Sequence, residues 1–456
     1  MGRPSWILLG TALALAPPLQ AVATTYYVRQ TVGDDSHDGT SPETAWLHIA
    51  KLSGAMHAGD VAYVGPGLYR EQITVLNDGT ADKRISFIAD PSGQRSGDPP
   101  GVVMITGAEP MDTSTFVADD APGVYTAPFS RPVWGLVEMD GDQSRYWRVK
   151  STQGLPQPEG VTELDMVAQR PSSFYYDEKA KILLVHTSDD KLPATHEMEI
   201  LVRDHGIGME GKHYVTVMGF TFRHMVDAGI GFYNASGDVI AIDNTSYGRR
   251  QGIRAHGTHI AVVGNTLFRN ENSGVYFLLQ STNSFVVRNA MYENIKGVRW
   301  SSQSANGTAV DNTLFDNQQA GISIESADHI ILRHNKVVNN GQTQLNVLQA
   351  EYASDDNCFA NGGSDQLIAD LPFVGRYRTL ADYQRGVHQD VSSREGGCGP
   401  LPDKVDVHKL DAEARGYADR ARRILSGAKE GAGEPKAAPV EEAPAARGWL
   451  QRLLGR

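Results

Sequence analysis

The chain is poor in cysteine, in positive charge and in familiar catalytic motifs. Cys358 and Cys398 are the only cysteines among 456 residues, so at most one intramolecular disulfide can form. The net charge of −12 argues against general nucleic-acid binding, which requires a basic footprint. No phosphate-binding loop, zinc-ligand cluster or serine-nucleophile elbow is present in convincing form. A chain of this length can form one large solenoid core or two ordinary domains.

The N-terminus carries a long apolar run. Residues 1–23 combine Arg3, an apolar stretch over residues 6–16 and the small residues Ala21 and Ala23. This layout is typical of a cleaved secretory signal and is too short to serve well as a membrane span. It predicts a periplasmic or secreted protein. In such an oxidising compartment Cys358 and Cys398 would form a disulfide, and two free buried thiols are the alternative.

The C-terminal residues change character in three steps. Residues 401–428 are interpreted as a C-terminal helix. Residues 429–446 are dominated by Ala, Pro, Glu, Lys and Gly, a composition that predicts a disordered linker. Residues 447–456, with sequence RGWLQRLLGR, could form a short amphipathic tail that makes a weak membrane or protein contact.

Between Gly206 and Asn340 the chain repeats itself with a period near 23 residues. The columns of the repeat are the asparagines Asn244, Asn265, Asn289, Asn312 and Asn335, preceded by Gly219 in the equivalent place; the aromatics Phe222, Tyr247, Phe268, Tyr292 and Phe315; the polar turn residues His224, Arg249, Asn270, Asn294, Asn317 and Asn340; and the glycines Gly206, Gly229, Gly252, Gly274, Gly297 and Gly321. This period, with short β-branched runs between turns, indicates a solenoid of strands. The frame of leucine-rich repeats is absent.

The repeat predicts an all-β fold, a right-handed parallel β-helix. One coil cannot bury its own apolar face, so stacking at about 4.8 Å per coil must build the core. The asparagine columns fit such a stack, because asparagine tolerates a left-handed bend and its amide can bond the asparagines of neighbouring coils. We therefore interpret these columns as scaffold.

Short segments in three parts of the chain resemble a known family. They are residues 26–28, 33–42, 45–49, 58–61 and 66–71 near the N-terminus; the run Phe174-Tyr175-Tyr176-Asp177 followed by residues 182–185; and residues 355–359, 380–384 and 389–390 near the end. Together they resemble the secreted parallel β-helix proteins related to pectate lyases and chondroitinase-B-like lyases. The resemblance implies an N-terminal cap and first coil over 24–110, an inserted β region with a hairpin over 111–200, regular coils over 201–350 and a closing segment over 351–400. It implies little about chemistry, since this family includes lyases, hydrolases, epimerases and members without known activity.

Alternation along the strand after each glycine column separates a core face from a solvent face. The inward pairs are Ile207/Met209, Ile230/Phe232, Ile253/Ala255, Val275/Phe277, Val298/Trp300 and Ile322/Ile324. The outward pairs are Gly208/Glu210, Gly231/Tyr233, Arg254/His256, Tyr276/Leu278, Arg299/Ser301 and Ser323/Glu325. Three consecutive coils therefore place Arg254, His256, Tyr276 and Arg299 within about 10 Å on one open face.

These four residues are the predicted catalytic group, and Tyr233, Arg250, Lys296 and Glu325 are the predicted substrate-binding residues. Arg249 is expected to flank the same strip. A basic and aromatic strip suits an acidic polysaccharide, because arginine binds carboxylates through paired hydrogen bonds and aromatic rings stack on sugars. The alternative is a solvated face with incidental charges.

The same group suits β-elimination on a uronate. Arg254 or Arg299 would neutralise the C6 carboxylate and so acidify the C5 proton, while His256 or Tyr276 would act as base or acid. We therefore expect a polysaccharide lyase. A C5-epimerase needs nearly the same site.

The scaffold also suits a glycoside hydrolase or a non-catalytic glycan-binding protein. A hydrolase needs two carboxyl groups about 5 to 9.5 Å apart, and Asp204 and Asp227, one coil apart, are the candidate pair. The same pair could hold Ca²⁺, but two carboxylates are a thin ligand set, so the sequence predicts no metal and no cofactor. Turn formation ahead of a glycine is the structural alternative for both residues.

Overall fold

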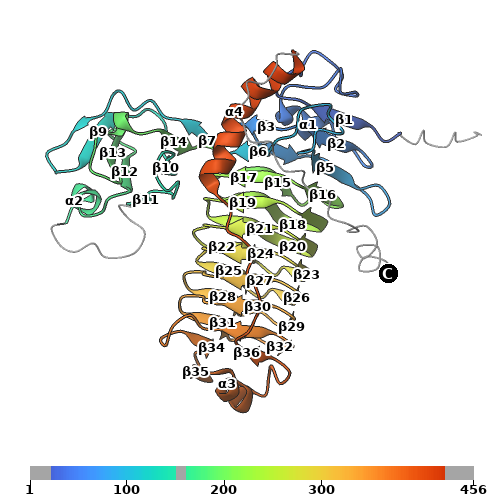
Figure 1. Cartoon of the computed structure of the whole chain (residues 1–456), viewed down its shortest axis with the longest axis vertical. Helices are drawn as coiled ribbons and strands as arrows, with labels where there is room; N and C mark the ends of the chain where they lie inside the picture. Colours follow the sequence, from blue (N-terminus) through green and yellow to red (C-terminus); the bar gives the residue numbers. More distant parts are fainter. Residues whose placement is uncertain (1–21, 150–160, 427–456) are drawn as a thin grey trace, which may run out of the picture.

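The computed structural model describes residues 22–149 and 161–426. Residues 1–21 of the predicted signal, together with the predicted linker and tail, lie outside the described residues. The described chain is a parallel β-helix, with its N-terminal coils at one end and its closing segment at the other (Figure 1). A smaller β region projects sideways near the N-terminal end, and the helix α4 (Val407–Leu425) lies across that end.

Each coil contributes one strand to each of three walls. The first wall comprises β15 (His205–Glu210), the first half of β18 (Ala228–Ile242), the first half of β20 (Gln251–Val263), β22 (Ser273–Phe277), β25 (Lys296–Ser301), β28 (Ala320–Glu325), β31 (Thr343–Leu348) and β34 (Leu367–Leu371). The second wall comprises β16 (Val215–Met218), the second halves of β18 and β20, β23 (Thr282–Val287), β26 (Ala305–Val310), β29 (Ile330–Arg333) and β32 (Tyr352–Asp355). The first two walls are continuous because β18 and β20 run through both.

The third wall consists of short strands of two to four residues. These are β3 (Gly67–Tyr69), β6 (Val103–Thr106, four residues), β17 (Thr221–Arg223), β19 (Thr245–Tyr247), β21 (Thr266–Phe268), β24 (Ala290–Tyr292), β27 (Thr313–Phe315), β30 (Lys336–Val338), β33 (Cys358–Ala360) and β36 (Arg394–Glu395). The N-terminal cap adds β1 (Thr25–Val28), the short helices η1 (Ile49–Lys51) and α1 (Leu52–Ala55), β2 (Val61–Val64), β4 (Ile73–Val75) and β5 (Ile85–Ala89).

The core lies inside the solenoid, and the predicted inward positions are confirmed. All twelve inward residues of the first wall are buried, among them Trp300, whose indole stacks on Phe277 and donates to Ser284 Oγ at 2.9 Å. The neighbouring coils are in the predicted register, with Arg254 opposite Tyr276 and Tyr276 opposite Arg299. Stacking of identical apolar positions therefore builds one continuous core along the solenoid axis.

The predicted asparagine ladder is present and buried. The side-chain amide of each asparagine donates to Oδ1 of the next, through Asn244, Asn265, Asn289, Asn312, Asn335 and Asn357 at 2.9–3.0 Å. A second ladder runs through Asn270, Asn294, Asn317 and Asn340 and ends on Gln344. Each amide also donates to a main-chain carbonyl of an adjacent coil, so the ladders satisfy buried polar groups at both edges of the third wall.

The structure corrects two details of the repeat. The left-handed bend falls on the residue before each ladder asparagine, such as Asp243 at φ 52° and Arg288 at φ 54°, so asparagine serves for its amide and not for its backbone. In the first copy, Arg223 and not Phe222 pairs with Tyr247, because the true step to the next coil is one residue shorter than the column predicted. Phe222 therefore points into the core.

The aromatic column forms a stack on the outer face of the third wall. The ring centroids of Tyr247, Phe268, Tyr292 and Phe315 are spaced 4.9 Å apart. The C-terminal segment covers this stack, and Val405 N donates to Tyr292 Oη at 2.9 Å. From there α4 reaches the N-terminal coils, where Tyr417 Oη donates to the carbonyl of Pro99 at 2.8 Å.

Charged residues buried beneath α4 join three parts of the chain. Arg223, from the third wall, is fully buried, and its Nη1 lies 2.6 Å from Asp411 Oδ1 of α4. Its Nη2 lies 3.3 Å from Glu199 Oε1, which also pairs with Arg70 at 2.7 Å. Burial opposes ionisation of Glu199, but the adjacent His224, whose Nδ1 lies 3.9 Å from Glu199 Oε2, and the charges of the two arginines hold the pKa of Glu199 well below its usual value.

The inserted region contains two small sheets, of which the first is antiparallel and the second is mixed, because its edge strand pairs in parallel with the neighbouring strand. One is formed by β7 (Ala108–Pro110), β14 (Met198–Leu201) and β10 (Leu136–Glu138). The other is formed by β8 (Val117–Ala118), β9 (Val124–Pro128), β13 (Ile182–His186), β12 (Ser173–Asp177) and the edge strand β11 (Trp147–Arg148), with α2 (Glu163–Ala168) packed against β12 and β13 and η2 (Pro193–Thr195) before β14. Strands β12 and β13 form an antiparallel pair at the residues where a hairpin is predicted.

The closing segment comprises β35 (Gly375–Tyr377) and α3 (Leu380–Val387). Here Cys358 and Cys398 form the expected disulfide, with Cα atoms 5.5 Å apart. None of the helices in residues 22–149 and 161–426 combines the length and apolarity needed to cross a bilayer.

Candidate active site on the first wall

The outward side chains of the first wall form a strip that we call the outer strip, comprising Asp227, Tyr233, Gln251, Arg254, His256, Asn272, Tyr276, Lys296, Arg299, Ser301, Ser323 and Glu325. The predicted catalytic and binding residues all lie on or beside it, but most of their side chains are half-buried. Glycine occupies the outward positions 208 and 231, and the rings of His205 and Tyr233 lie against the sheet at these two positions. A Cβ atom at Gly231 would come within 2.1 Å of the Tyr233 ring, and one at Gly208 within 2.4 Å of His205.

The first cluster on the strip is centred on Asp227, in the turn before β18. Arg254 Nη1 lies 3.2 Å from Asp227 Oδ2, and Tyr233 Oη donates to the same oxygen at 3.0 Å. With its amide nitrogen turned toward the carboxylate, Gln251 donates to Asp227 Oδ1 at 2.8 Å. The guanidinium of Arg254 also lies over the Tyr233 ring, 5.5 Å from its centroid. Asp227 therefore fixes the position of Arg254.

Two histidines lie beside this cluster, and both favour the neutral form. His256 follows Arg254 by two residues on the same face of β20; burial and then the Arg254 charge lower the pKa of its imidazole below 6.5. Burial also lowers the pKa of His205, whose Nε2 is buried without a hydrogen-bond partner among the described residues. Burial raises the pKa of Tyr233 and its Asp227 partner raises it further, so this phenol is a poor base at neutral pH.

The second cluster is centred on Glu325 of β28. Lys296 Nζ lies 2.5 Å from Glu325 Oε1, Arg299 Nη2 lies 2.6 Å from Oε2, and Ser323 donates to Oε1. Burial opposes ionisation of Glu325, but the hydrogen bonds of Lys296 and Ser323 and the charges of Lys296 and Arg299 hold its pKa below the usual value.

Tyr276 extends this second cluster toward the first. Its ring lies under the Arg299 guanidinium, 4.6 Å from Cζ to the ring centroid. The Tyr276 and Ser301 hydroxyls are 2.9 Å apart. Arg299 Nη1 also reaches Asn272 Oδ1 at 3.4 Å.

The ion pairs change the electrostatic picture of the strip. The sequence indicates a row of open cations, whereas Arg254 is paired with Asp227, and Lys296 and Arg299 share Glu325. Arg250 is exposed and has no ion pair among the described residues. Arg249 is wrongly placed by the sequence, since its side chain is fully buried inside the solenoid and donates to the Phe222 carbonyl. Burial lowers the pKa of Arg249 to about 9.

Sequence reasoning missed His205, Gln251 and Asn272, the residue that contacts Arg299. The glycines at positions 208 and 231 are the available signal for His205, because a glycine on an outward strand position leaves room for a ring to lie over it. The other predicted carboxylate, Asp204, is exposed in the preceding coil. Its main chain, rather than its side chain, connects it to Asp227, whose N–H donates to the Asp204 carbonyl at 2.9 Å.

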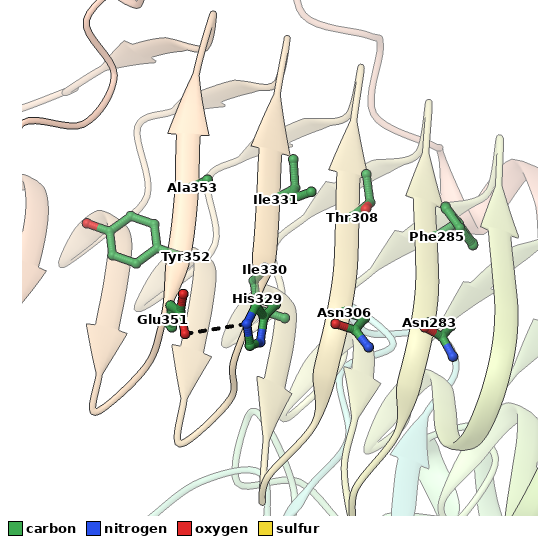
Figure 2. A pocket seen from close by; sticks show the side chains of 10 residues that line it. All are labelled: Asn283, Phe285, Asn306, Thr308, His329, Ile330, Ile331, Glu351, Tyr352 and Ala353. Atoms are coloured by element: carbon green, nitrogen blue, oxygen red, sulfur yellow. Dashed lines mark ion pairs between the residues drawn. The ribbon is translucent and has the colours of Figure 1, made fainter.

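The second wall carries a separate hollow near the closing segment, bounded by β23, β26, β29 and β32 (Figure 2). Figure 2 shows Phe285, Thr308, Ile331 and Ala353 in a row above the ion pair between His329 and Glu351. The two side chains are 3.6 Å apart and more than half exposed, so their interaction is weak. Among the described residues that line the hollow, no fixed cation lies beside a base, an arrangement that the outer strip provides.

One group with metal-ligand spacing occurs in the inserted region, formed by Glu138, Asp140 and His196. Imidazole hydrogen bonds account for it: His196 Nδ1 lies 3.2 Å from Asp140 Oδ2, and Nε2 lies 3.0 Å from Asp189 Oδ1. Burial opposes a charged His196, but the carboxylates, Glu138 first, raise its pKa above the usual value. The attraction between this imidazole and the carboxylates therefore accounts for the cluster.

Comparisons with known proteins agree with the fold. Residues 205–360 match the family model described as a right handed beta helix region, in agreement with the right-handed fold that the repeat predicts. A mannuronan C5-epimerase of Pseudomonas putida is 28% identical over 182 residues, which amount to 37% of this chain and 34% of that protein. The aligned part thus spans about a third of the length of this relative.

Among solved structures, XylC, determined in complex with xylose, aligns with a TM-score of 0.51 and 16% identity over 76% of this chain and 70% of that one. At this identity the likeness shows the fold alone. Pectate lyase Pel9A aligns more loosely, with a TM-score of 0.45 and 12% identity over 84% of this chain and 88% of that one, too loosely to bear on function.

Proposed function

We propose that the outer strip binds an acidic polysaccharide and removes the C5 proton of a uronate residue. The observation that carries the proposal is the pair Arg254 and His256, which places a cation held by Asp227 beside a neutral imidazole on one open strand. These are the two groups that abstraction of a proton next to a carboxylate requires. The partial likeness to a mannuronan C5-epimerase supports a uronate substrate.

In the proposed reaction, Arg254 binds the C6 carboxylate and stabilises the negative charge that develops there as the C5–H bond breaks. The imidazole of His256 accepts the C5 proton. The electron pair left on C5 forms the C4–C5 double bond, and the C4–O4 bond breaks. The departing O4 accepts a proton, and the Tyr276 hydroxyl, on the strand that pairs with Arg254, is the proposed donor. Arg299 binds the neighbouring sugar through its exposed edge.

The carboxylates that pair with Arg254 and Arg299 indicate which of the two arginines can bind the substrate carboxylate. Asp227 approaches Arg254 through one nitrogen, Nη1, and Nε is buried, so Nη2 is the nitrogen available to a ligand carboxylate. Both Arg299 Nε and Nη2 are bound to Glu325, so this guanidinium is less available. The geometry therefore favours Arg254 as the neutralising group.

C5-epimerisation is the second candidate, favoured by the sequence match to an epimerase. It shares the abstraction step but returns a proton to C5 from the opposite ring face. The Arg254, His256 and Tyr276 side chains all come from one wall, and this supports elimination from a single face of the sugar. A hydrolase is less well supported, because three donors already engage Asp227 of the predicted carboxylate pair.

A panel of uronic-acid polymers, incubated with the protein in deuterated buffer, separates these reactions. A new ultraviolet absorbance from a C4–C5 double bond identifies the lyase. Deuterium at C5 without that absorbance identifies the epimerase. New reducing ends without either signal would instead identify a hydrolase, and saturable binding with no reaction would identify a glycan-binding protein. Loss of the signal in Arg254→Ala and His256→Ala assigns the reaction to the outer strip.

A further inference from the structure

Two exposed tryptophans on the inserted region stand out from the rest of the surface. Trp134 is 47% exposed and Trp147 is 41% exposed. Each has an arginine against its ring: Arg148 Cζ lies 5.1 Å from the Trp134 ring, and Arg170 Cζ lies 4.8 Å from the Trp147 ring. An exposed indole beside a cation offers both a stacking face and a charge to a ligand.

These arginines differ from those of the outer strip. Arg254 and Arg299 each face a carboxylate, whereas neither Arg148 nor Arg170 has an ion pair within residues 22–149 and 161–426. Burial lowers the pKa of Arg148, and the nearby Arg145 lowers it further, so two cations approach each other here. Such an arrangement leaves a local positive potential on a chain that is acidic as a whole.

The tryptophans are connected to the outer strip through the scaffold. Arg145 donates to the Trp134 carbonyl, and its Nη1 also pairs with Glu271 Oε2 of the solenoid at 3.1 Å. Glu271 directly precedes Asn272, which contacts Arg299 at 3.4 Å. A second bond holds the same junction, because Arg269 donates to the Asp142 carbonyl at 3.1 Å. The inserted region is thus fastened to the edge of the first wall beside the candidate active site, on the side of β22 (Figure 1).

We propose that Trp134 with Arg148 and Trp147 with Arg170 form a second binding site for an anionic polysaccharide. The proposal rests on the proposed function, because the occupant is a further part of the polymer that the outer strip acts on. The two pairs meet at the free edge of the sheet, because Trp147 and Arg148 are successive residues of its edge strand β11 and their side chains leave it on opposite sides. A polymer that crosses this edge contacts both pairs. Sugar rings stack on the indoles while their carboxylates meet the guanidinium groups.

If this second site exists, the affinity of the protein for a polysaccharide should increase with the length of the polysaccharide. A short oligosaccharide fills the outer strip alone, whereas a polymer also reaches the tryptophans and gains affinity from the second contact. Turnover of short substrates should therefore not change when the tryptophans are removed.

The test measures binding of the full chain to polymannuronate and to polygalacturonate, with dextran as the neutral polymer, in a His256→Ala background that prevents turnover. We expect Trp134→Ala with Trp147→Ala to weaken binding of at least one acidic polymer by about tenfold, a typical loss for an aromatic anchor. Phe373→Ala is the matched control, because Phe373 is 78% exposed and lies between β34 and β35, two strands that Figure 1 shows at the opposite end of the solenoid from the inserted region. Its affinity should equal that of the parent.

The charge is tested separately with Arg148→Gln and Arg170→Gln. This double variant should bind the acidic polymer more weakly, with a smaller loss of affinity on adding salt, because fewer ionic contacts remain to be screened. Unchanged affinity in the tryptophan variant, or binding of none of the polymers by the parent, would overturn the second site. If binding depends on the tryptophans but the unsubstituted protein turns over none of the polymers, the second site is upheld and the proposed reaction is rejected. If the unsubstituted protein turns over a polymer but binding does not depend on the tryptophans, the reaction is upheld and the second site is rejected.

Discussion

Asp227 and Arg254 form an ion pair across one coil step, with 3.2 Å between Oδ2 and Nη1. The bond joins two residues that the sequence assigns to rival mechanisms, the carboxylate of a hydrolase and the cation of a lyase. Tyr233 and Gln251 bind the same carboxylate, so Asp227 is best understood as the residue that positions Arg254.

Replacing Asp227 by Asn should lower kcat/KM by about 10- to 100-fold, as is typical when the partner of a functional group is removed. The amide can accept the Tyr233 hydrogen bond but no longer holds the guanidinium by charge. Asp204→Asn, in the preceding coil, is the matched control and should retain parental activity. A double-mutant cycle with Arg254→Ala should show that the two losses do not add. If Asp227→Asn and Asp204→Asn both abolish activity while Arg254→Ala does not, the chemistry belongs to the carboxylate pair.

The pH profile should report His256. The base must be neutral, and burial and the Arg254 charge place its pKa below 6.5, so activity should be constant above that pKa and fall as pH decreases through it. His256→Ala should reduce kcat far more than it raises KM. In Arg254→Gln the loss of the neighbouring charge should raise the His256 pKa, which NMR titration of the imidazole measures directly. A lower or unchanged value would contradict the proposed coupling.

The asparagine ladder should contribute to stability through its interior members. Asn289→Leu removes amide bonds to Asn312 Oδ1 and to the Val262 carbonyl and leaves Asn265 without its acceptor. We expect destabilisation of about 1 to 3 kcal/mol in denaturant unfolding. Gln318→Leu, an exposed polar-to-apolar change beside the second ladder, should have little effect. Equal stability of the two variants would mean that the ladder bonds are replaced by water at no cost.

The inward and outward faces of neighbouring strands should respond oppositely to truncation. Trp300→Ala removes a fully buried indole and should cost about 3 to 5 kcal/mol. Tyr276→Ala, on the outward face of the adjoining strand, should leave the melting temperature nearly unchanged while reducing activity. A large loss of stability in Tyr276→Ala would show that the outer strip is part of the structural core.

Asp411 should be essential for attaching α4. Asp411→Ala leaves the fully buried Arg223 with Glu199 as its remaining carboxylate, which Arg70 already shares. Removing one partner of a buried ion pair typically costs about 3 to 5 kcal/mol. Asp419→Ala, on an exposed part of the same helix, is the control. Limited proteolysis of α4 should be accelerated in the first variant only.

The coils were predictable because the sequence has the same period as the coils of the solenoid. Each glycine, asparagine and aromatic column corresponds to one position of the coil, and alternation then separates residues such as Trp300 from residues such as Arg254. The first copy was misaligned by one residue because Gly219 stands next to the true column position, Phe220, whose N–H bonds Asn244. A single irregular coil gives no second example from which to correct the register.

The outward placement of the candidate residues was predictable, but their pairing with opposite charges was not. Sequence shows that Arg254 and Arg299 face outward, yet the partners that neutralise them come from other coils, and pairing depends on side-chain direction as well as spacing. Arg249 was misplaced for the same reason, since the turn before β20 directs it inward into a position that asparagine takes in later coils. The tryptophans of the inserted region lie outside the repeat, so no column drew attention to them.

The return of α4 to the N-terminal coils affects the order in which the protein can mature. The hydrogen bond between Tyr417 and Pro99 joins residues 318 positions apart, so the first coils are synthesised long before the helix that covers them. Until α4 emerges from the ribosome, Arg223 lacks Asp411 and part of the third wall lacks its cover. Middle coils can stack on one another as they appear, but the N-terminal end acquires its final stability only after synthesis passes residue 425.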